Sequence, residues 1–207
     1  MELNPHDLLQ IKEVTDLISY TTIPEWVEGA LNNAPFVVVR RVHAPKGLCA
    51  IGVRGSTRSE RFGAFLDINK IVKRIKPEQL VDERNWKNNT KEIFRCLDQI
   101  DNILKKYSLS WGPAGSVGFE LASGKDTVTE KSDVDIIIHT TEGLPLEIAK
   151  EIKQEFDNIP YRPDVQVEFE EGAFSLIEYI QSEGKSILLR TANGPMLKRV
   201  SILGLKK

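Results

Sequence analysis

The segment Ser132-Asp133-Val134-Asp135-Ile136-Ile137-Ile138 places two carboxylates two positions apart at the head of a β-branched apolar run. Because residues i and i+2 of a β-strand point to the same face, Asp133 and Asp135 should lie side by side on one buried strand. Two parallel carboxylates repel each other unless a cation lies between them. Mg²⁺ is commonly bound by one or two carboxylates together with substrate phosphates. The segment therefore predicts a metal site for chemistry at a phosphate.

A second motif, Gly115-Ser116, precedes this strand. Backbone amides at such a glycine can approach a phosphate closely. Each motif alone has an ordinary explanation, since Asp-X-Asp is usually a solvated turn or an exposed strand face and Gly-Ser is usually turn chemistry. In combination, Gly-Ser followed by Ser-Asp-X-Asp resembles the signature of the nucleotidyltransferase superfamily.

The resemblance narrows to one family, the phosphoribosyl-dephospho-CoA transferases of malonate decarboxylase. The gap between Ser116 and Asp133 is longer than in most of the superfamily and is similar to the pattern of this family. The segments that resemble the family follow one another along nearly the whole chain: residues 6–9, 35–41, 52–55, Arg58, Arg61, 111–124, 132–135, 164–166, 172–174, 188–191 and 194–195.

The resemblance implies a reaction and a cofactor. The chain is expected to transfer the 2'-(5-triphosphoribosyl)-3'-dephospho-CoA prosthetic group to a serine of the malonate decarboxylase acyl-carrier subunit, with release of diphosphate. Mg²⁺ is the implied cofactor, and Asp133 and Asp135 are the implied metal ligands and catalytic residues. These residues would polarise the α-phosphate through the metal.

Superfamily members generally use a third carboxylate on a neighbouring strand. Asp164, at the head of an apolar alternating segment, is the candidate and would help to deprotonate the attacking serine. Glu168 is the alternative, because positions 164, 166 and 168 share one face of that strand. Its place in the run Glu168-Phe169-Glu170-Glu171 favours a solvated side chain.

The substrate carries many negative charges and needs basic partners. Gly115 and Ser116 are expected to hold the triphosphate through backbone amides and one hydroxyl, and the family pattern adds Arg54, Arg58 and Arg61. The triplet Arg54-Gly55-Ser56 joins a bidentate cation to open amides. The alternative for these arginines is an ordinary solvated or salt-bridged position.

Two other functions remain open at this point. A nucleotidyltransferase could use another small-molecule or protein acceptor, or a non-catalytic nucleotidyltransferase-like domain could bind a protein partner. The match along the N-terminal half argues against a different acceptor. The intact pair Asp133 and Asp135 argues against a non-catalytic domain, which has no need for two crowded carboxylates.

Composition excludes several other classes of protein. The 207 residues are 41% hydrophobic and 28% charged, as in ordinary globular proteins. The formal net charge of −2 predicts no general attraction to nucleic acid or to anionic membranes. No apolar stretch approaches the ~18 residues of a membrane span, and the N-terminus lacks the features of a signal peptide. Cys49 and Cys96 are expected as reduced core residues, and the expected location is cytoplasmic.

The pattern of elements predicts an α+β fold in two domains: a smaller α/β accessory domain over residues 1–86 and a nucleotidyltransferase domain with a mixed sheet over 87–207. Apolar residues at spacings of three and four predict a long helix over 90–106. Residues 57–75 have a mixed pattern and receive no assignment. The other predicted helices are 25–31, a short one from 77, 145–156 and 172–181, and the predicted strands are 36–42, 48–53, one ending near 111, 133–140, 164–169 and 186–190.

Overall fold

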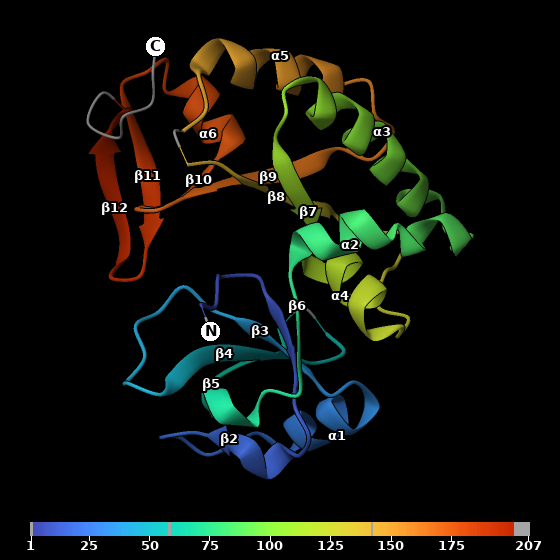
Figure 1. Ribbon diagram of the computed structural model, residues 1–207, viewed down its shortest axis with the longest axis vertical. Helices are drawn as coiled ribbons and strands as arrows, with labels where there is room; N and C mark the ends of the chain where they lie inside the picture. The colour runs from blue at the N-terminus through green and yellow to red at the C-terminus, as the bar shows by residue number, and fades with distance from the viewer. Residues whose placement is uncertain (1, 58, 142, 201–207) are drawn as a thin grey trace.

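The computed structural model of the chain describes residues 2–57, 59–141 and 143–200. It contains two six-stranded sheets, one built from the N-terminal part and one from the C-terminal part. Figure 1 shows the N-terminal unit, in blue to blue-green, below the C-terminal unit, in green to red. The α+β class predicted from the sequence is confirmed.

The N-terminal sheet has the strand order β2-β5-β4-β3-β1-β6, and every neighbouring pair is antiparallel. The predicted hairpin of residues 36–42 and 48–53 and the predicted helix over 25–31 are confirmed as β3, β4 and α1. The segment 57–75, which the sequence left unassigned, contains β5, η2 and β6 within residues 61–75. The elements are β1 (Leu8–Gln10), η1 (Val14–Asp16), β2 (Leu17–Ile18), α1 (Glu25–Asn33), β3 (Phe36–Val39), β4 (Leu48–Arg54), β5 (Arg61–Asp67), η2 (Ile68–Lys70) and β6 (Lys73–Ile75).

The C-terminal sheet has the order β12-β11-β10-β9-β8-β7. Its β8–β9 pair is parallel and its other pairs are antiparallel, so the mixed sheet is also confirmed. The elements are α2 (Pro77–Glu83), η3 (Asn85–Asn88), α3 (Glu92–Lys106), β7 (Ser110–Pro113), α4 (Gly115–Ser123), β8 (Val134–His139), α5 (Leu146–Phe156), β9 (Pro163–Phe169), β10 (Gly172–Ser175), α6 (Leu176–Gln181), β11 (Ser186–Thr191) and β12 (Gly194–Arg199).

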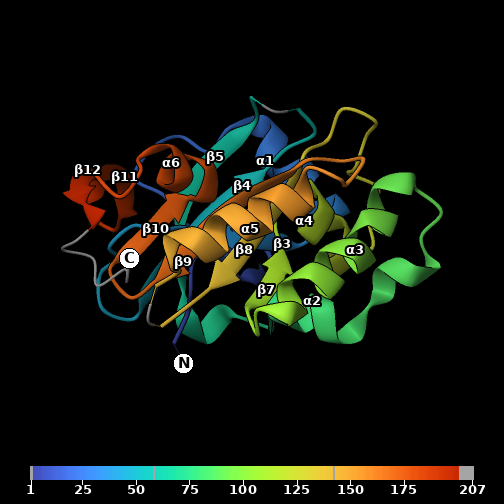
Figure 2. The ribbon, with the colours of Figure 1, turned by 90° about the horizontal axis from the view of Figure 1, so that it is seen from above.

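The helices α3, α5 and α6 cover the face of this sheet that lies away from the N-terminal unit (Figures 1 and 2). The predicted periodicity of α3 is confirmed, because Ile93, Leu97, Ile100 and Leu104 are all buried in the C-terminal core. Apolar burial of this kind contributes about 1.5–3 kcal/mol per large side chain. The opposite face of the sheet is left to meet the N-terminal unit.

The helix predicted over residues 172–181 is wrong in its first part. Gly172–Ser175 forms β10, which pairs with β9 and β11, and only Leu176–Gln181 is helical. Ala173 and Phe174 are fully buried in the sheet. A short apolar run has no clear period, so tertiary pairing determines its structure. Strand β12, which has three exposed positions in its middle, had no sequence prediction.

The two units meet through a small apolar cluster and the helix α2. Pro77 at the start of α2 lies against Gly112 of β7 so closely that a side chain at position 112 would collide with it. Phe36 of β3 and Phe119 of α4 pack edge to face with ring centroids 6.4 Å apart. Trp86, which follows α2, is buried in the C-terminal core. The division after residue 86 stays a prediction.

The two cysteines agree with their predicted role. Cys49 and Cys96 are buried and free, and burial raises the pKa of their thiols to about 11 and about 12. No helix within the described ranges is long and apolar enough to cross a membrane.

Candidate active site

The three predicted carboxylates lie at the start of the parallel β8–β9 pair. Asp135 is directly opposite Asp164 in the strand register, and Asp133 stands just ahead of β8, two positions before Asp135. Burial, followed by the charges of Asp164 and Asp133, raises the pKa of the Asp135 carboxyl above its usual value. Like charges therefore converge here, which is the condition that a bound cation would relieve.

Asp135 and Asp164 line an open cavity of about 440 Å³, called here the carboxylate cavity. His6 reaches it from the N-terminal unit, and Arg190 of β11 reaches it from the far side. The guanidinium of Arg190 lies 3.8 Å from the carboxylate of Glu178. The cavity thus combines an acidic floor with cationic groups at its edge.

Gly115 fits against the Asp135 carboxylate in a way that no other residue could. It opens helix α4 with φ of 56°, and a Cβ at this position would collide with the carboxyl group of Asp135. A positive φ is cheap only for glycine. The free amides at the start of a helix attract phosphate groups. The predicted Gly-Ser turn is therefore the first turn of a helix, placed beside the carboxylates.

Ser116 has a different environment from Gly115. Its side chain is buried, with 5% of the residue exposed, and its carbonyl accepts a hydrogen bond from the Thr127 hydroxyl. Gly115 lines the carboxylate cavity, whereas Ser116 does not. The hydroxyl predicted to hold the triphosphate therefore lies behind the helix start, within the unit's interior.

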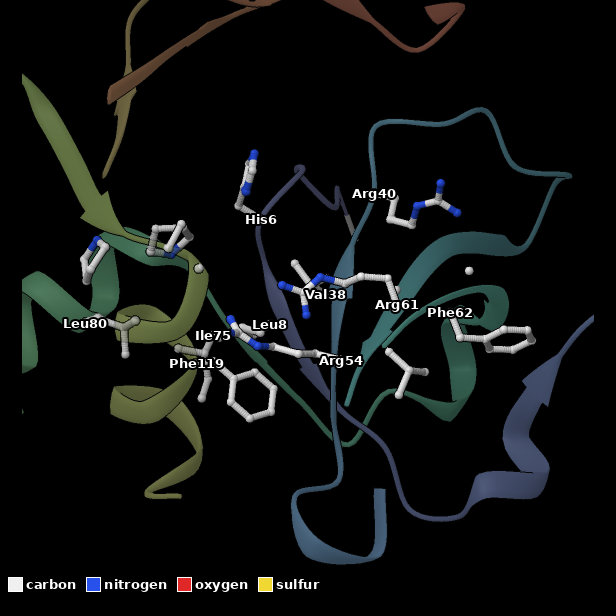
Figure 3. Close-up of a pocket in the computed structure, with 17 residues that line it drawn as sticks. His6, Leu8, Val38, Arg40, Arg54, Arg61, Phe62, Ile75, Leu80 and Phe119 are labelled. Atoms are coloured by element: carbon white, nitrogen blue, oxygen red, sulfur yellow. The ribbon is translucent and has the colours of Figure 1, made fainter. Parts of the chain in front are cut away.

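Arg54 and Arg61 are directly opposite each other at the ends of β4 and β5. Figure 3 shows both side chains extending toward α4. Burial and the neighbouring charge of Arg61 lower the pKa of Arg54, while the charge of Asp135 raises it. Arg54 is thus close enough to Asp135 for their charges to interact. Arg58 lies outside the described residues.

These two arginines line a second cavity of about 390 Å³ between the N-terminal sheet and α4, called here the arginine cavity (Figure 3). It meets the carboxylate cavity at His6, Ala114 and Gly115, which line both. The residues predicted separately from each half of the chain therefore border two connected spaces.

Glu168 does not have the solvated position that its acidic run suggested. It is buried, with 5% exposed, and its carboxylate lies 2.5 Å from Arg41 Nη2 and 3.1 Å from His6 Nε2. Burial opposes its ionisation, but hydrogen bonds from His139 and His6 and the charge of Arg41 hold its pKa far below the usual value. Glu168 is paired with these residues, whereas Asp164 lies directly opposite Asp135 in the strand register. Asp164 as the third carboxylate stays a prediction.

His6 and His139 are the contributors that sequence reasoning missed. His6 has φ of 71°, and its Nε2 lies 3.0 Å from Gln166 Nε2. His139 lies between Glu78 and Glu168; burial lowers its pKa, but hydrogen bonds to Glu168 and Glu78 raise it to about 9 overall. The sequence signals for His6 were the family resemblance over residues 6–9 and the shared strand face of residues 164, 166 and 168, on which Gln166 and Glu168 contact it.

The donor set suits a hard divalent cation. Within residues 2–57, 59–141 and 143–200, no group of three or more His, Cys, Asp or Glu side chains is arranged to hold a metal ion. Asp133 and Asp135 would supply two protein ligands, with water and phosphate oxygens in the remaining positions. Mg²⁺ commonly binds in this way, and the mutual repulsion of the carboxylates fits such an ion.

The chain matches two family models in succession. The phosphoribosyl-dephospho-CoA transferase MdcG N-terminal domain matches residues 4–77, and the C-terminal domain of the same family matches residues 79–201. No solved structure matches the chain.

Curated relatives agree over nearly the full length. Each of the following is named phosphoribosyl-dephospho-CoA transferase. The protein of Pseudomonas syringae pv. tomato is 34% identical over 93% of this chain and 90% of its own. The protein of Pseudomonas putida is 35% identical over 93% of this chain and 92% of its own length. The protein of Azotobacter vinelandii is 32% identical over 93% of this chain and 91% of its own length. The chain belongs to the phosphoribosyl-dephospho-CoA transferase family.

Proposed function

We propose that this chain carries out the family's transfer reaction at the carboxylate cavity. The substrate is 2'-(5-triphosphoribosyl)-3'-dephospho-CoA, and the acceptor is a serine of the malonate decarboxylase acyl-carrier subunit in the cytoplasm. The observation that carries this assignment is the register of Asp135 against Asp164, with Gly115 against the same carboxylate. This arrangement places acidic oxygens beside helix amides that favour phosphate.

The reaction forms one bond and breaks one. The carrier serine Oγ attacks the α-phosphorus, the bond from that phosphorus to the bridging oxygen breaks, and diphosphate leaves. Asp164 accepts the serine proton, because it is exposed at the open side of the cavity next to Asp135. The amides at the start of α4 and the side chain of Arg190 bind the phosphate oxygens.

Mg²⁺ is proposed as the cofactor, with Asp133 and Asp135 as its ligands. When bound, it would neutralise charge on the phosphates and on the departing diphosphate. The support from the residues is the oxygen-only donor set and the repulsion that raises the pKa of Asp135. Arg54, which interacts with the charge of Asp135 from the other unit, adds positive charge on the substrate side.

The test is the intact mass of the apo carrier subunit after incubation with this protein, Mg²⁺ and the triphosphoribosyl substrate. A gain equal to the phosphoribosyl-dephospho-CoA group, abolished by EDTA and by Asp135→Asn, is the expected result. No gain despite binding of the substrate would indicate a different acceptor. A gain that persists in EDTA would overturn the metal assignment while leaving the reaction in place.

A further inference from the structure

The two faces of the N-terminal sheet have different partners. Strand alternation places one set of side chains against α1, among them Val37, Ile51 and Leu66. The other set faces the C-terminal unit. On that side β1, β3 and β6 pack against Leu80 of α2 and Phe119 of α4, whereas β4 and β5 border the arginine cavity. One half of this face is therefore packed and the other half is open.

Two glycines lie in the open half of this sheet face, on β4 and β5. Gly52 of β4 and Gly63 of β5 are directly opposite each other in the register, and both line the arginine cavity. A Cβ at Gly63 would meet the guanidinium of Arg40, and one at Gly52 would lie 3.3 Å from Val38. The space over the two glycines is taken by the Arg40 side chain, so the pair admits a third guanidinium to the cavity beside Arg54 and Arg61.

Two arginines of this cavity make no close ion pair within the described residues, and the charge of Asp135 acts on Arg54 from a longer distance. Within the described part of the chain, neither Arg54 nor Arg61 lies within 4.0 Å of a carboxylate, unlike Arg41 and Arg74, which pair with Glu168 and Asp7. Arg54 and Arg61 are neighbours that repel each other. Two adjacent guanidinium groups match the oxygens of two linked phosphates.

Apart from His6 and Arg40, the remaining wall of the cavity is largely apolar. Leu8, Ile75 and Phe119 lie near the end of Arg54 (Figure 3), and Leu80 also lines the cavity. A space of about 390 Å³ with apolar walls and a few convergent cations is the common form of a small-molecule site. A ligand with an aromatic ring and a diphosphate fits this lining, because the ring can contact the apolar wall and the phosphates can bind the arginines.

We infer that the arginine cavity binds the dephospho-CoA end of the substrate, with its adenine ring against the apolar wall that includes Phe119 and its diphosphate on Arg54 and Arg61. The identity of the ligand rests on the proposed function. The connection at His6 and Gly115 then lets the triphosphate of the same molecule reach the carboxylate cavity. The N-terminal unit thereby supplies the arginines that bind the diphosphate, α4 supplies an aromatic contact for the base, and the carboxylates of the C-terminal sheet act on the triphosphate.

The test measures binding of dephospho-CoA itself, which lacks the triphosphate, by calorimetry in EDTA. We expect wild-type protein to bind it, and Arg54→Gln and Arg61→Gln each to weaken binding by about tenfold or more. Arg61→Lys should give an intermediate loss, because it keeps the charge without the fork. Arg95→Gln, at an exposed arginine of α3 outside both cavities, is the matched control. Thermal unfolding checks that each variant is folded.

Competition identifies the part of the ligand that occupies the cavity. ADP should displace dephospho-CoA, whereas 4'-phosphopantetheine should not. Displacement by 4'-phosphopantetheine alone, wild-type affinity in both glutamine variants, or no binding to the wild-type protein would each overturn the inference.

The same titration separates this inference from the proposed function. Arginine-dependent binding without transfer to the carrier would leave the cavity assignment standing and reject the reaction. Transfer to the carrier, together with dephospho-CoA binding that does not depend on Arg54 or Arg61, would reject the cavity assignment and leave the reaction standing. Asp135→Asn should retain dephospho-CoA binding while losing transfer, because its carboxylate borders the other cavity.

Discussion

The two ends of the β8–β9 pair carry carboxylates with opposite surroundings. At the start of the strands, Asp135 faces Asp164; four residues further along, about 13 Å away by strand geometry, His139 faces Glu168. At the first end the charges are alike, and burial and repulsion raise the pKa of Asp135. At the second end His139, His6 and Arg41 lie close to Glu168, and they hold the pKa of its carboxyl far below its usual value.

The start of the two strands is therefore suited to binding a ligand, whereas the other end holds the two units together. Unrelieved repulsion between Asp135 and its neighbours costs stability and is useful only when a cation binds. The pairs of Glu168 with His6 and Arg41 join the two units without any ligand. Substitution of acids at the two ends should therefore have opposite effects on activity and stability, and four experiments test this contrast.

The largest effect is expected from Asp135→Asn. Transfer to the carrier should fall by about three orders of magnitude, because a metal ligand is lost. The melting temperature should stay the same or rise, since a repelling charge is removed. Intact-mass rates and thermal unfolding measure both, with Asp157→Asn, at the exposed residue that follows α5, as the control. A variant with transfer within tenfold of wild type would rule out the metal assignment.

Gly115→Ala should reproduce part of this loss without changing any charge. Its Cβ collides with the Asp135 carboxylate, and its φ of 56° is strained for alanine. We expect about a hundredfold loss of transfer and a cost of about 1–3 kcal/mol in unfolding free energy. Gly124→Ala is the matched control, with φ of 70° and no atom within 4 Å of its Cβ. It should lose stability only; equal loss of transfer in both would refute the contact argument.

Glu168→Gln should act in the opposite sense. Removal of the buried charge leaves His6, Arg41 and His139 without their partner, and breaking a buried pair typically costs about 3–5 kcal/mol. Denaturant unfolding should show this loss of stability. Transfer, measured at saturating substrate and below the melting temperature, should fall far less than in Asp135→Asn. Glu171→Gln, which breaks an exposed pair with Lys198, should cost no more than about 1 kcal/mol. A similar small cost at Glu168 would contradict the contrast.

The smallest effect is a pH dependence of stability at the paired end. The folded pKa of His139 is raised from 6.5 to about 9, so the folded state binds more protons than the unfolded state between these values. Its contribution is complete below pH 6.5 and is lost as the pH rises through about 9. We expect unfolding free energy to fall by about 2 kcal/mol over this range. Denaturation at several pH values should show this slope, and His139→Gln should flatten it; an unchanged slope in the variant would exclude His139 as its source.

Local pattern predicted the strand that carries Asp135, the helix α3 and the β3–β4 hairpin, because period and apolar runs are local properties. Asp133, predicted on the same strand, lies one residue before its start. Pattern also predicted Asp164 on a second strand. It could not predict that Asp164 lies opposite Asp135, since a parallel register depends on a non-local pairing.

The other features that the sequence did not predict also depend on residues far apart in the chain or on the arrangement of the fold. Glu168 is buried by partners at positions 6 and 41, the second of them 127 residues away in sequence. Residues 57–75 showed no clear period because one face of β5 borders the arginine cavity with Arg61 and Gly63 in place of apolar side chains. The cavity that obscured the strand is also the place where a ligand fits.

The N-terminal sheet begins and ends at one edge, because its first strand β1 pairs with its last strand β6. The residues just outside these strands, His6 and Glu78, both reach the C-terminal unit. Both ends of the N-terminal sheet's chain path are therefore joined to the catalytic sheet at this edge. Arg61 lies on β5, three strands away from β1 in the sheet order, so the arginine cavity extends from this joined edge across most of the N-terminal sheet.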